Sequence, residues 1–176
     1  MPNNYEHPAW AIYDELVTIK LNVYYVEWEQ LVFRRSLLFS ELFLALSASS
    51  AVASFWIWKT TALGGLIWQS IAMLAAITAV TKPILNLSEK IVVTTELLTD
   101  ARNIEHELNT LVQLIRQSDD YDSHHKERFM KAMEYKGNFI KNYKNGKSNR
   151  RKVDELYNRV LKEMPPERFH IPGEQP

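Results

Sequence analysis

The chain has 176 residues, of which 46% are hydrophobic and 24% charged, and its 21 basic and 21 acidic side chains leave no net charge. A chain of this length is the size of one domain. Because it contains no cysteine, disulfide scaffolds, cysteine zinc sites and cysteine nucleophiles are excluded. The sequence also contains no glycine-rich phosphate loop and no Ser/His/Asp grouping. We therefore expect a protein that is not an enzyme and that has neither a cofactor nor a metal site.

Residues 1–35 are predicted to form a cytoplasmic lead-in helix rich in aromatic residues. Between Pro8 and Gly64 there is neither glycine nor proline, so one long helix is expected. Apolar residues recur every seven positions in two rows: Trp10, Val17, Tyr24 and Leu31, and Ile12, Ile19, Val26 and Phe33. The helix is thus apolar on more than one face. It is expected to pack on helices of its own chain, or else to use its aromatic side chains on another subunit or on the membrane surface.

Residues 36–82 are predicted to form a transmembrane helical hairpin. The one charged residue between positions 42 and 81 is Lys59, which leaves uncharged runs of 17 and 22 residues. About 20 helical residues cross a bilayer core of about 30 Å. We therefore expect spans near residues 37–58 and 66–81, with the reversal at Gly64 and Gly65. The rival interpretation is a buried hairpin in a soluble protein, which so short a chain can hardly surround with apolar residues.

The basic residues that flank these spans predict the orientation of the hairpin. Arg34, Arg35, Lys82 and Lys90 lie at its open end, and Lys59 lies at its tip. Cytoplasmic flanks of membrane spans carry the excess of lysine and arginine. The sequence therefore predicts a multi-pass protein of the cell inner membrane with both termini in the cytoplasm.

Two polar features of the hairpin are candidates for function. Glu41 is the acidic residue nearest the membrane core; it is expected either to pair with Arg34 or Arg35 or to form the mouth of a pore or a protonation switch. Eight of the ten residues at positions 45–54 are small, and small residues let helices associate in lipid. The candidates for helix association or pore lining are Glu41, Ser47, Ser50, Ala51, Ser54 and Gln69.

Residues 83–117 are predicted to form a cytoplasmic stem helix, kinked at Pro83. It carries two heptad rows: Ile84, Ile91, Leu98, Glu105 and Val112, and Leu87, Thr94, Ala101, Leu108 and Ile115. Glu105, Thr94 and Ala101 weaken the apolar seam. The stem is expected to pack on helices of its own chain, with an intermolecular coiled coil as the alternative.

Residues 118–164 are predicted to form a basic helical module, and residues 165–176 an extended tail. Asp122 or Ser123 is expected to cap a helix whose apolar face is Phe129, Met133, Lys136, Ile140 and Tyr143. Ser148 or Asn149 is expected to cap a last helix that stops at Pro165 and Pro166. His124 and His125 are expected to face solvent. The tail is expected either to dock through Phe169 or to remain disordered.

The charges of the cytoplasmic part are unevenly distributed. Residues 126–152 hold ten basic and two acidic side chains, whereas residues 82–123 hold four basic and eight acidic ones. The two segments are electrostatically complementary, and the basic one could bind a nucleotide, a nucleic acid or the anionic inner leaflet, or be a solvated helix face. The candidates for anion or partner binding are Lys147, Arg150, Arg151 and Lys152.

The layout of residues 10–117 resembles the SLATT family, small bacterial effectors with two transmembrane helices that act in anti-phage and nucleotide-signalling systems. The features that carry the resemblance are the lead-in from Tyr24, Tyr25 and Trp28 to Arg34 and Arg35, the serine- and alanine-rich first span, the glycine turn, and the stem at residues 86–115. The resemblance implies homo-oligomers that permeabilise the inner membrane when a partner senses infection. Because no attached sensor domain is evident, we expect the trigger to be a separate sensor or regulator protein, or a ligand at the basic residues.

Two functions are therefore expected from the sequence. The first is an oligomeric effector in anti-phage defence that perturbs or permeabilises the inner membrane when a partner or ligand releases it. The alternative is a non-enzymatic membrane anchor that presents a helical module to a soluble partner or a nucleic acid.

Overall fold

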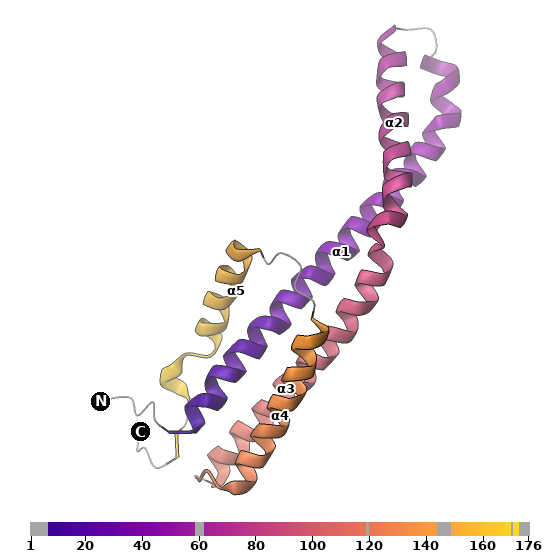
Figure 1. Cartoon of the computed structure of the whole chain (residues 1–176). Helices are drawn as coiled ribbons and strands as arrows, with labels where there is room; N and C mark the ends of the chain where they lie inside the picture. Colours follow the sequence, from indigo (N-terminus) through magenta and orange to yellow (C-terminus); the bar gives the residue numbers. More distant parts are fainter. Residues whose placement is uncertain (1–6, 59–61, 119, 144–148, 170, 173–176) are drawn as a thin grey trace. The chain divides into compact units, whose positions relative to one another are not determined.

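The computed structural model of the chain describes residues 7–58, 62–118, 120–143, 149–169 and 171–172, with side chains described for all of these except 48–58, 62–65, 67, 68 and 83. These residues form five α-helices and one short 3-10 helix, and none of them is in a strand (Figure 1). The elements are α1 (Ala9–Trp58), α2 (Ala62–Leu85), α3 (Leu87–Ser118), α4 (Ser123–Asn142), α5 (Arg150–Glu163) and η1 (Pro166–Arg168). The prediction of an all-α fold is confirmed.

The chain divides into two compact units. Unit 1 consists of Met1–Trp28 and Thr94–Pro176, and unit 2 consists of Glu29–Val93. The helices α1 and α3 each begin in one unit and end in the other. Unit 1 therefore contains the first part of α1, most of α3, and all of α4 and α5, whereas unit 2 contains the rest of α1, α2 and the start of α3.

The core of unit 1 lies where α1 packs against α3 and α4. Its central side chains are fully buried and come from all three helices: Ile12, Ile19 and Val26 of α1, Ala101, Leu108 and Leu111 of α3, and Phe139 of α4. Ile12, Ile19 and Val26 belong to one of the two rows that the heptad spacing predicts. The first part of α1 therefore packs on helices of its own chain.

A second cluster covers another face of α1. Trp10, Tyr13 and Val17 pack against Val160 of α5 and against Ile171 of the tail, and α5 lies along α1 in Figure 1. The ring of Phe169 lies 5.1 Å from that of Tyr13, between centroids, so the tail docks through Phe169 as predicted. The alternative that the aromatic side chains of this segment lie on a membrane surface is wrong for Trp10, Tyr13 and Tyr25, which are buried.

The predicted packing of the stem on its own chain is confirmed within unit 1. Thr94, Ala101, Leu108 and Ile115 are all buried, which is one of the two heptad rows. In the other row Leu98 is buried but Ile84 is 74% exposed. The row that contains Thr94 and Ala101 thus faces the neighbouring helices. Small side chains at these two positions let α1 and α4 approach α3 closely.

The predicted apolar face of α4 is confirmed at Phe129, Met133 and Tyr143, which pack against the core. It is wrong at Ile140. Ile140 is 54% exposed, whereas its neighbour Phe139 is buried together with Ala132 and His125. These three buried residues stand seven apart, so the face toward α1 and α3 follows the heptad row of His125. The prediction that His125 faces solvent is therefore also wrong, whereas His124 is exposed.

The predicted caps of the last two helices are confirmed. The Asp122 carboxylate accepts a hydrogen bond of 2.9 Å from the backbone N–H of His125, and the Asp122 N–H donates to the Nδ1 atom of His125, which completes a capping box. At α5 the Asn149 side chain accepts from the N–H of Lys152 at 3.2 Å. That helix ends at Glu163, just before Pro165.

In unit 2 the chain runs out along α1 and returns along α2. The Nζ atom of Lys82 lies 3.2 Å from a carboxylate oxygen of Glu41, so the two helices are antiparallel neighbours. The predicted reversal at Gly64 and Gly65 is wrong, because both glycines lie inside α2, which begins at Ala62. Residues 59–61, including Lys59, lie outside the described residues.

The predicted kink at Pro83 is wrong, because the helix breaks three residues later, at Asn86. Pro83 belongs to α2, and the break between α2 and α3 is at Asn86, whose φ of 45° is the left-handed conformation that asparagine tolerates better than most residues. Among the described residues no single helix has the length and apolar composition of a membrane span, whereas Gln69–Lys82 and Leu87–Ser118, inclined by 47°, meet that test as a pair.

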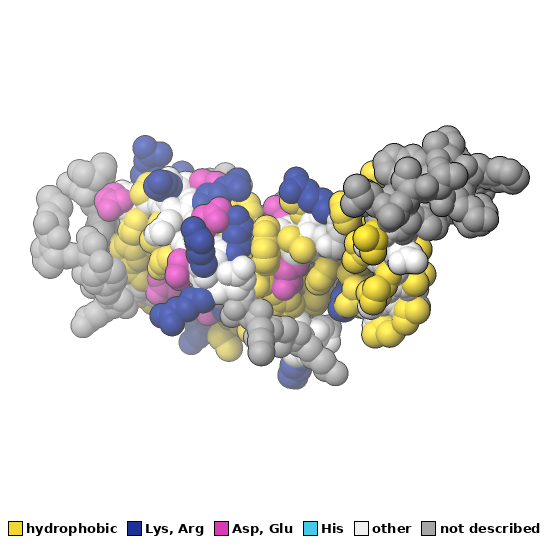
Figure 2. All heavy atoms as spheres, turned by 90° about the horizontal axis from the view of Figure 1, so that it is seen from above, with side chains coloured by type: hydrophobic (Ala, Val, Ile, Leu, Met, Phe, Trp, Pro, Cys, Tyr) yellow, Lys and Arg dark blue, Asp and Glu magenta, His cyan; other side chains and the backbone are white. Residues whose placement is uncertain are grey.

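Unit 2 carries most of the exposed apolar surface. Fifteen of the nineteen large hydrophobic side chains that are exposed belong to it, and Leu87 is the one buried residue among those described there. Figure 2 shows hydrophobic side chains gathered at the right-hand end of the view. Unit 2 thus has almost no core of its own.

Candidate functional site

Glu41 is tied across the hairpin to α2. Its partner is Lys82, at 3.2 Å, and not Arg34 or Arg35 as predicted. Both side chains are partly exposed. The pair joins two residues 41 positions apart in sequence, so it fixes the register of α1 on α2 near the open end of the hairpin.

The small residues of α1 fall partly in the seam between α1 and α2. Half-buried positions recur every three or four residues on both helices: Leu37, Ser40, Leu44 and Ser47 on α1, and Ile71, Ala75, Thr78 and Lys82 on α2. The hydroxyl of Ser47 donates to the Phe43 carbonyl of its own helix at 2.7 Å. The side chains of the predicted residues Ser50, Ala51 and Ser54 lie outside the described part of the chain.

Gln69 stands at one end of a row of alanines on α2. Gln69, Ala72, Ala76 and Ala79 are all exposed and stand three or four residues apart, so they share one stripe of the helix. Ala75 lies on the adjacent, half-buried face. The alanines of α2 are therefore divided between a face toward α1 and a face that no described helix of unit 2 covers.

The basic residues at the start of α5 are accessible. Arg150 and Arg151 are exposed, and Lys152 is paired with Glu155 of the same helix at 2.7 Å. Lys147 lies outside the described residues. Because the Asn149 side chain already accepts one of the first N–H groups of α5, the helix start is less available to an external anion than the sequence suggests.

Polar contacts hold α5 on α1 at both of its ends. Tyr25 accepts a hydrogen bond of 3.0 Å from the N–H of Asn149 at one end of α5, and Tyr13 donates one of 2.7 Å to the Met164 carbonyl at the other. Close to the second end, the Glu163 carboxylate receives hydrogen bonds from Tyr24 at 2.5 Å and Arg159 at 2.9 Å. Lys20 also reaches Glu163, at 3.2 Å.

This arrangement shifts two pKa values in opposite directions. The hydrogen bonds from Tyr24 and Arg159 lower the pKa of Glu163 from 4.5 to about 2, and burial together with the bond to Glu163 raises the pKa of Tyr24 from 10.0 to about 12. A lowered carboxyl pKa contributes stability that is present above pH 4.5 and lost as the pH falls toward 2. A raised tyrosine pKa contributes stability that is present below pH 10 and lost as the pH rises toward 12.

The variant Glu163→Gln is therefore expected to flatten the acid limb of the stability curve. Between pH 4.5 and 2 the free energy of unfolding of the wild type should fall more steeply than that of the variant, because the variant has no carboxyl to protonate at this position. Urea unfolding followed by circular dichroism at several pH values measures the difference. Equal slopes for the two proteins would contradict the contact between Tyr24 and Glu163.

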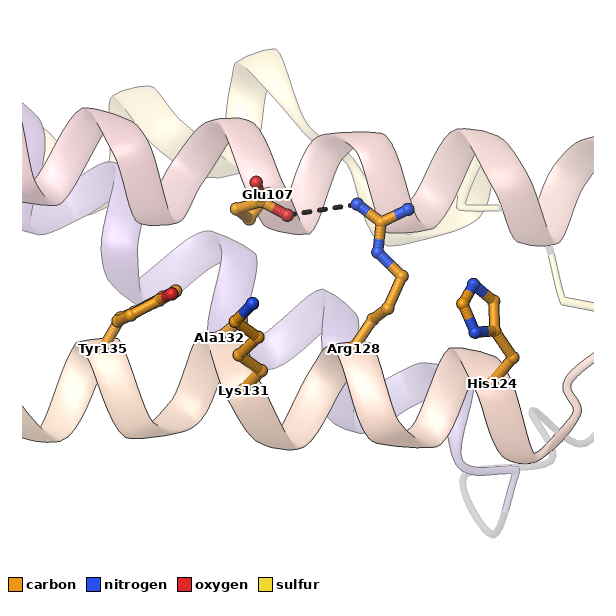
Figure 3. Close-up of a pocket in the computed structure, with 6 residues that line it drawn as sticks. All are labelled: Glu107, His124, Arg128, Lys131, Ala132 and Tyr135. Carbon is orange, nitrogen blue, oxygen red and sulfur yellow. Dashed lines mark hydrogen bonds and ion pairs between the residues drawn. The ribbon is translucent and has the colours of Figure 1, made fainter.

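A groove runs between α3 and α4 in unit 1 (Figure 3). It consists of two adjoining cavities of about 330 and 400 Å³, which share Glu107 and Tyr135. The first is lined also by His124, Arg128, Lys131 and Ala132, and the second by Asp100, Asn103, Ile104, Asn138 and Phe139. In Figure 3 the side chains of Arg128, Lys131 and Tyr135 point from α4 toward α3.

The groove is basic at one end and acidic at the other. Arg128 of α4 lies 3.1 Å from Glu107 of α3, so the predicted attraction between the basic and acidic segments is observed at this pair. Lys131 and Asp100 form no ion pair among the described residues. The groove was not predicted from the sequence, because it lies outside residues 147–152, where an anion site was expected.

Comparison of the chain with protein-family models, with curated proteins and with solved structures gives no match. Within the part of the chain that the structure describes, no group of three or more His, Asp or Glu side chains is placed to hold a metal ion.

Proposed function

We propose that the chain is an oligomeric membrane effector that perturbs or permeabilises the inner membrane. In this proposal unit 2 is a hairpin inside the bilayer, unit 1 is a helical bundle in the cytoplasm, and a partner or ligand acting on unit 1 changes the assembly of the hairpins. We propose anti-phage defence as the setting of this activity, because the layout of residues 10–117 resembles that of small two-transmembrane effectors.

The observation that carries the proposal is the composition of the surface of unit 2. Met73, Leu74, Ile77 and Val80 are 49% to 67% exposed on successive turns of α2, and Leu38, Phe39, Leu42 and Leu46 are 60% to 74% exposed on α1. In water, a monomer rarely carries so large an apolar surface. In lipid the same side chains are favourably solvated, and the hairpin needs no core.

Helix lengths and charges agree with such an insertion. The uncharged parts of the two helices, 17 residues at 42–58 of α1 and 20 residues at 62–81 of α2, extend over about 25 and 30 Å, close to the thickness of a bilayer core of about 30 Å. The pair of Glu41 and Lys82 lies near the open end of the hairpin, where both side chains can reach interfacial water.

The stripe of Gln69, Ala72, Ala76 and Ala79 supports association between copies. Because apolar side chains gain nothing by leaving lipid for each other, helices in membranes associate through small residues that allow close backbone approach. Two spans cannot enclose a conduit, so permeabilisation requires several hairpins. This exposed stripe on α2 is the surface that we assign to the contact.

The double variant Ala72→Leu and Ala76→Leu is therefore expected to abolish both self-association and leakage. The added side chains separate the helices, so the oligomer seen by cross-linking in vesicles should become a monomer, and dye release should fall to that of empty vesicles. The matched control, Met73→Leu and Ile77→Leu, changes a neighbouring stripe of similar exposure and should leave both measurements unchanged. Equal behaviour of the two double variants would contradict the assignment.

One observation favours the alternative of a membrane anchor. The hydroxyls of Ser47, Ser70, Thr78 and Thr81 all donate to carbonyls of their own helices, at 2.7 to 3.0 Å. They are thus satisfied locally and do not need a water-filled path. If the reconstituted wild-type protein inserts into vesicles but releases no dye, the proposal of a permeabilising effector is wrong. The alternative of a membrane anchor then takes its place.

A further inference from the structure

We infer that the groove between α3 and α4 is a binding site for a nucleoside monophosphate. The inference does not depend on the proposed membrane function, because every residue that lines the groove belongs to unit 1. It is separate from the start of α5, where the basic residues suggested an anion site. The chemistry of each end of the groove points to one part of such a molecule.

The basic end fits the phosphate. His124, Arg128 and Lys131 stand on one stripe of α4 and line the same cavity. Arg128 is held in place by Glu107, 3.1 Å away, whereas Lys131 forms no ion pair with any described residue. Lys131 therefore offers a phosphate a positive charge that no described residue of unit 1 neutralises in an ion pair, and His124 offers a ring N–H beside it.

The middle of the groove fits a flat ring. Tyr135 lines both cavities and is 47% exposed, so one of its surfaces is open to a ligand. The Nζ atom of Lys131 lies over one face of this ring, 6.0 Å from its centroid, so a base next to the proposed phosphate position would stack on the opposite face. Stacking of a base on an aromatic side chain is the usual way in which proteins hold unpaired bases.

The other end fits the amino group of a base. Asp100 accepts hydrogen bonds only, and Asn103 and Asn138 can both donate and accept. Asn138 stands seven residues beyond Lys131, which corresponds to about 10 Å along the helix. That spacing is comparable to the distance between the phosphate and the amino group of an adenine nucleotide. The two cavities, of about 330 and 400 Å³, are also of the size of small-ligand sites.

The test is isothermal titration calorimetry of the full chain purified in a mild detergent, which does not require insertion into a bilayer, with AMP as the probe. AMP is expected to bind at least tenfold more tightly than adenosine, which lacks the phosphate, and at least tenfold more tightly than ribose 5-phosphate, which lacks the base. No measurable binding of AMP would overturn the inference. Equal affinity for AMP and ribose 5-phosphate would also overturn it, because the groove would then be a simple anion site.

Two variants assign the binding to the groove. Lys131→Gln is expected to weaken AMP binding at least tenfold, and Tyr135→Leu is expected to weaken AMP binding about tenfold without changing the affinity for ribose 5-phosphate. The control is Lys141→Gln, an exposed lysine of α4 that does not line the groove, and its affinity should equal that of the wild type. If Lys141→Gln weakens AMP binding as much as Lys131→Gln does, the loss reflects the lower positive charge of the protein as a whole. The assignment of AMP to the groove is then wrong.

Discussion

Replacing Met73 and Ile77 together by arginine is expected to abolish membrane insertion of the hairpin. The two residues lie one turn apart near the middle of α2 and are 67% and 49% exposed. An arginine near the centre of a membrane helix costs about 2.5 to 3.5 kcal/mol on insertion scales. Two of them therefore cost roughly 5 to 7 kcal/mol, a factor of about 10⁴ to 10⁵ in the insertion equilibrium. Membrane flotation of the expressed protein measures the loss.

The same experiment shows whether the exposed side chains of α2 are in contact with lipid or with water. On the surface of a soluble protein two such changes at exposed positions alter stability by about 0.5 kcal/mol each or less. The control pair is Val92→Arg and Val93→Arg, which are exposed apolar residues of α3 beyond the predicted spans, and it should leave insertion unchanged. Unchanged insertion of the variant with arginines at positions 73 and 77 would mean that α2 is not in a bilayer.

Replacing Ile12 by alanine is expected to destabilise unit 1 strongly. Ile12 is fully buried where α1 packs on α3 and α4. Truncating a buried isoleucine to alanine leaves a cavity in addition to the lost burial, and costs about 2 to 5 kcal/mol. Urea unfolding of the full chain in nanodiscs, followed by circular dichroism, gives the free energy of unfolding of both proteins.

The matched control for this prediction is Ile140→Ala on α4. The residue type and the truncation are the same, but Ile140 is 54% exposed. Its replacement should change the free energy of unfolding by about 0.5 kcal/mol or less. If both variants lose the same amount, the packing of α4 against α1 and α3 is wrong, since that packing buries Phe139 and exposes Ile140.

The core of unit 1 was largely predictable from spacing in the sequence. Ile12, Ile19 and Val26 recur every seven residues and are all fully buried, because a helix covered on one side repeats its buried face with nearly that period. The caps Asp122 and Asn149 were predictable as well, since short polar side chains compete well for the first free N–H groups of a helix.

The errors have a common physical origin in contacts between helices. On α4 only Ile140 was assigned wrongly, because Phe139 and Ile140 are neighbours of similar hydrophobicity and the choice between them depends on where α1 and α3 lie. Glu41 was assigned to a partner nearby in sequence, but the antiparallel packing of α2 brings Lys82 within 3.2 Å. Local periodicity carries no information on the register between two helices.

The charges that line the groove could be predicted from the sequence, but the position of the groove could not. The basic run that contains Lys131 and the acidic run that contains Asp100 were both evident, and so was their mutual attraction. Which residues face each other follows from the register of α4 on α3, which the ion pair of Arg128 and Glu107 reports. The positions of Asn103, Tyr135 and Asn138 around one cavity emerge only from that register.

The most direct test of the account is whether unit 2 is held by lipid. Membranes from cells that express the full chain are washed in alkaline carbonate, which removes peripheral proteins, and then extracted with detergent. The account predicts that the protein stays in the carbonate pellet and enters solution only with detergent, as an oligomer. Recovery of a monodisperse monomer in the carbonate supernatant would contradict it, because the exposed side chains of α2 would then be in contact with water.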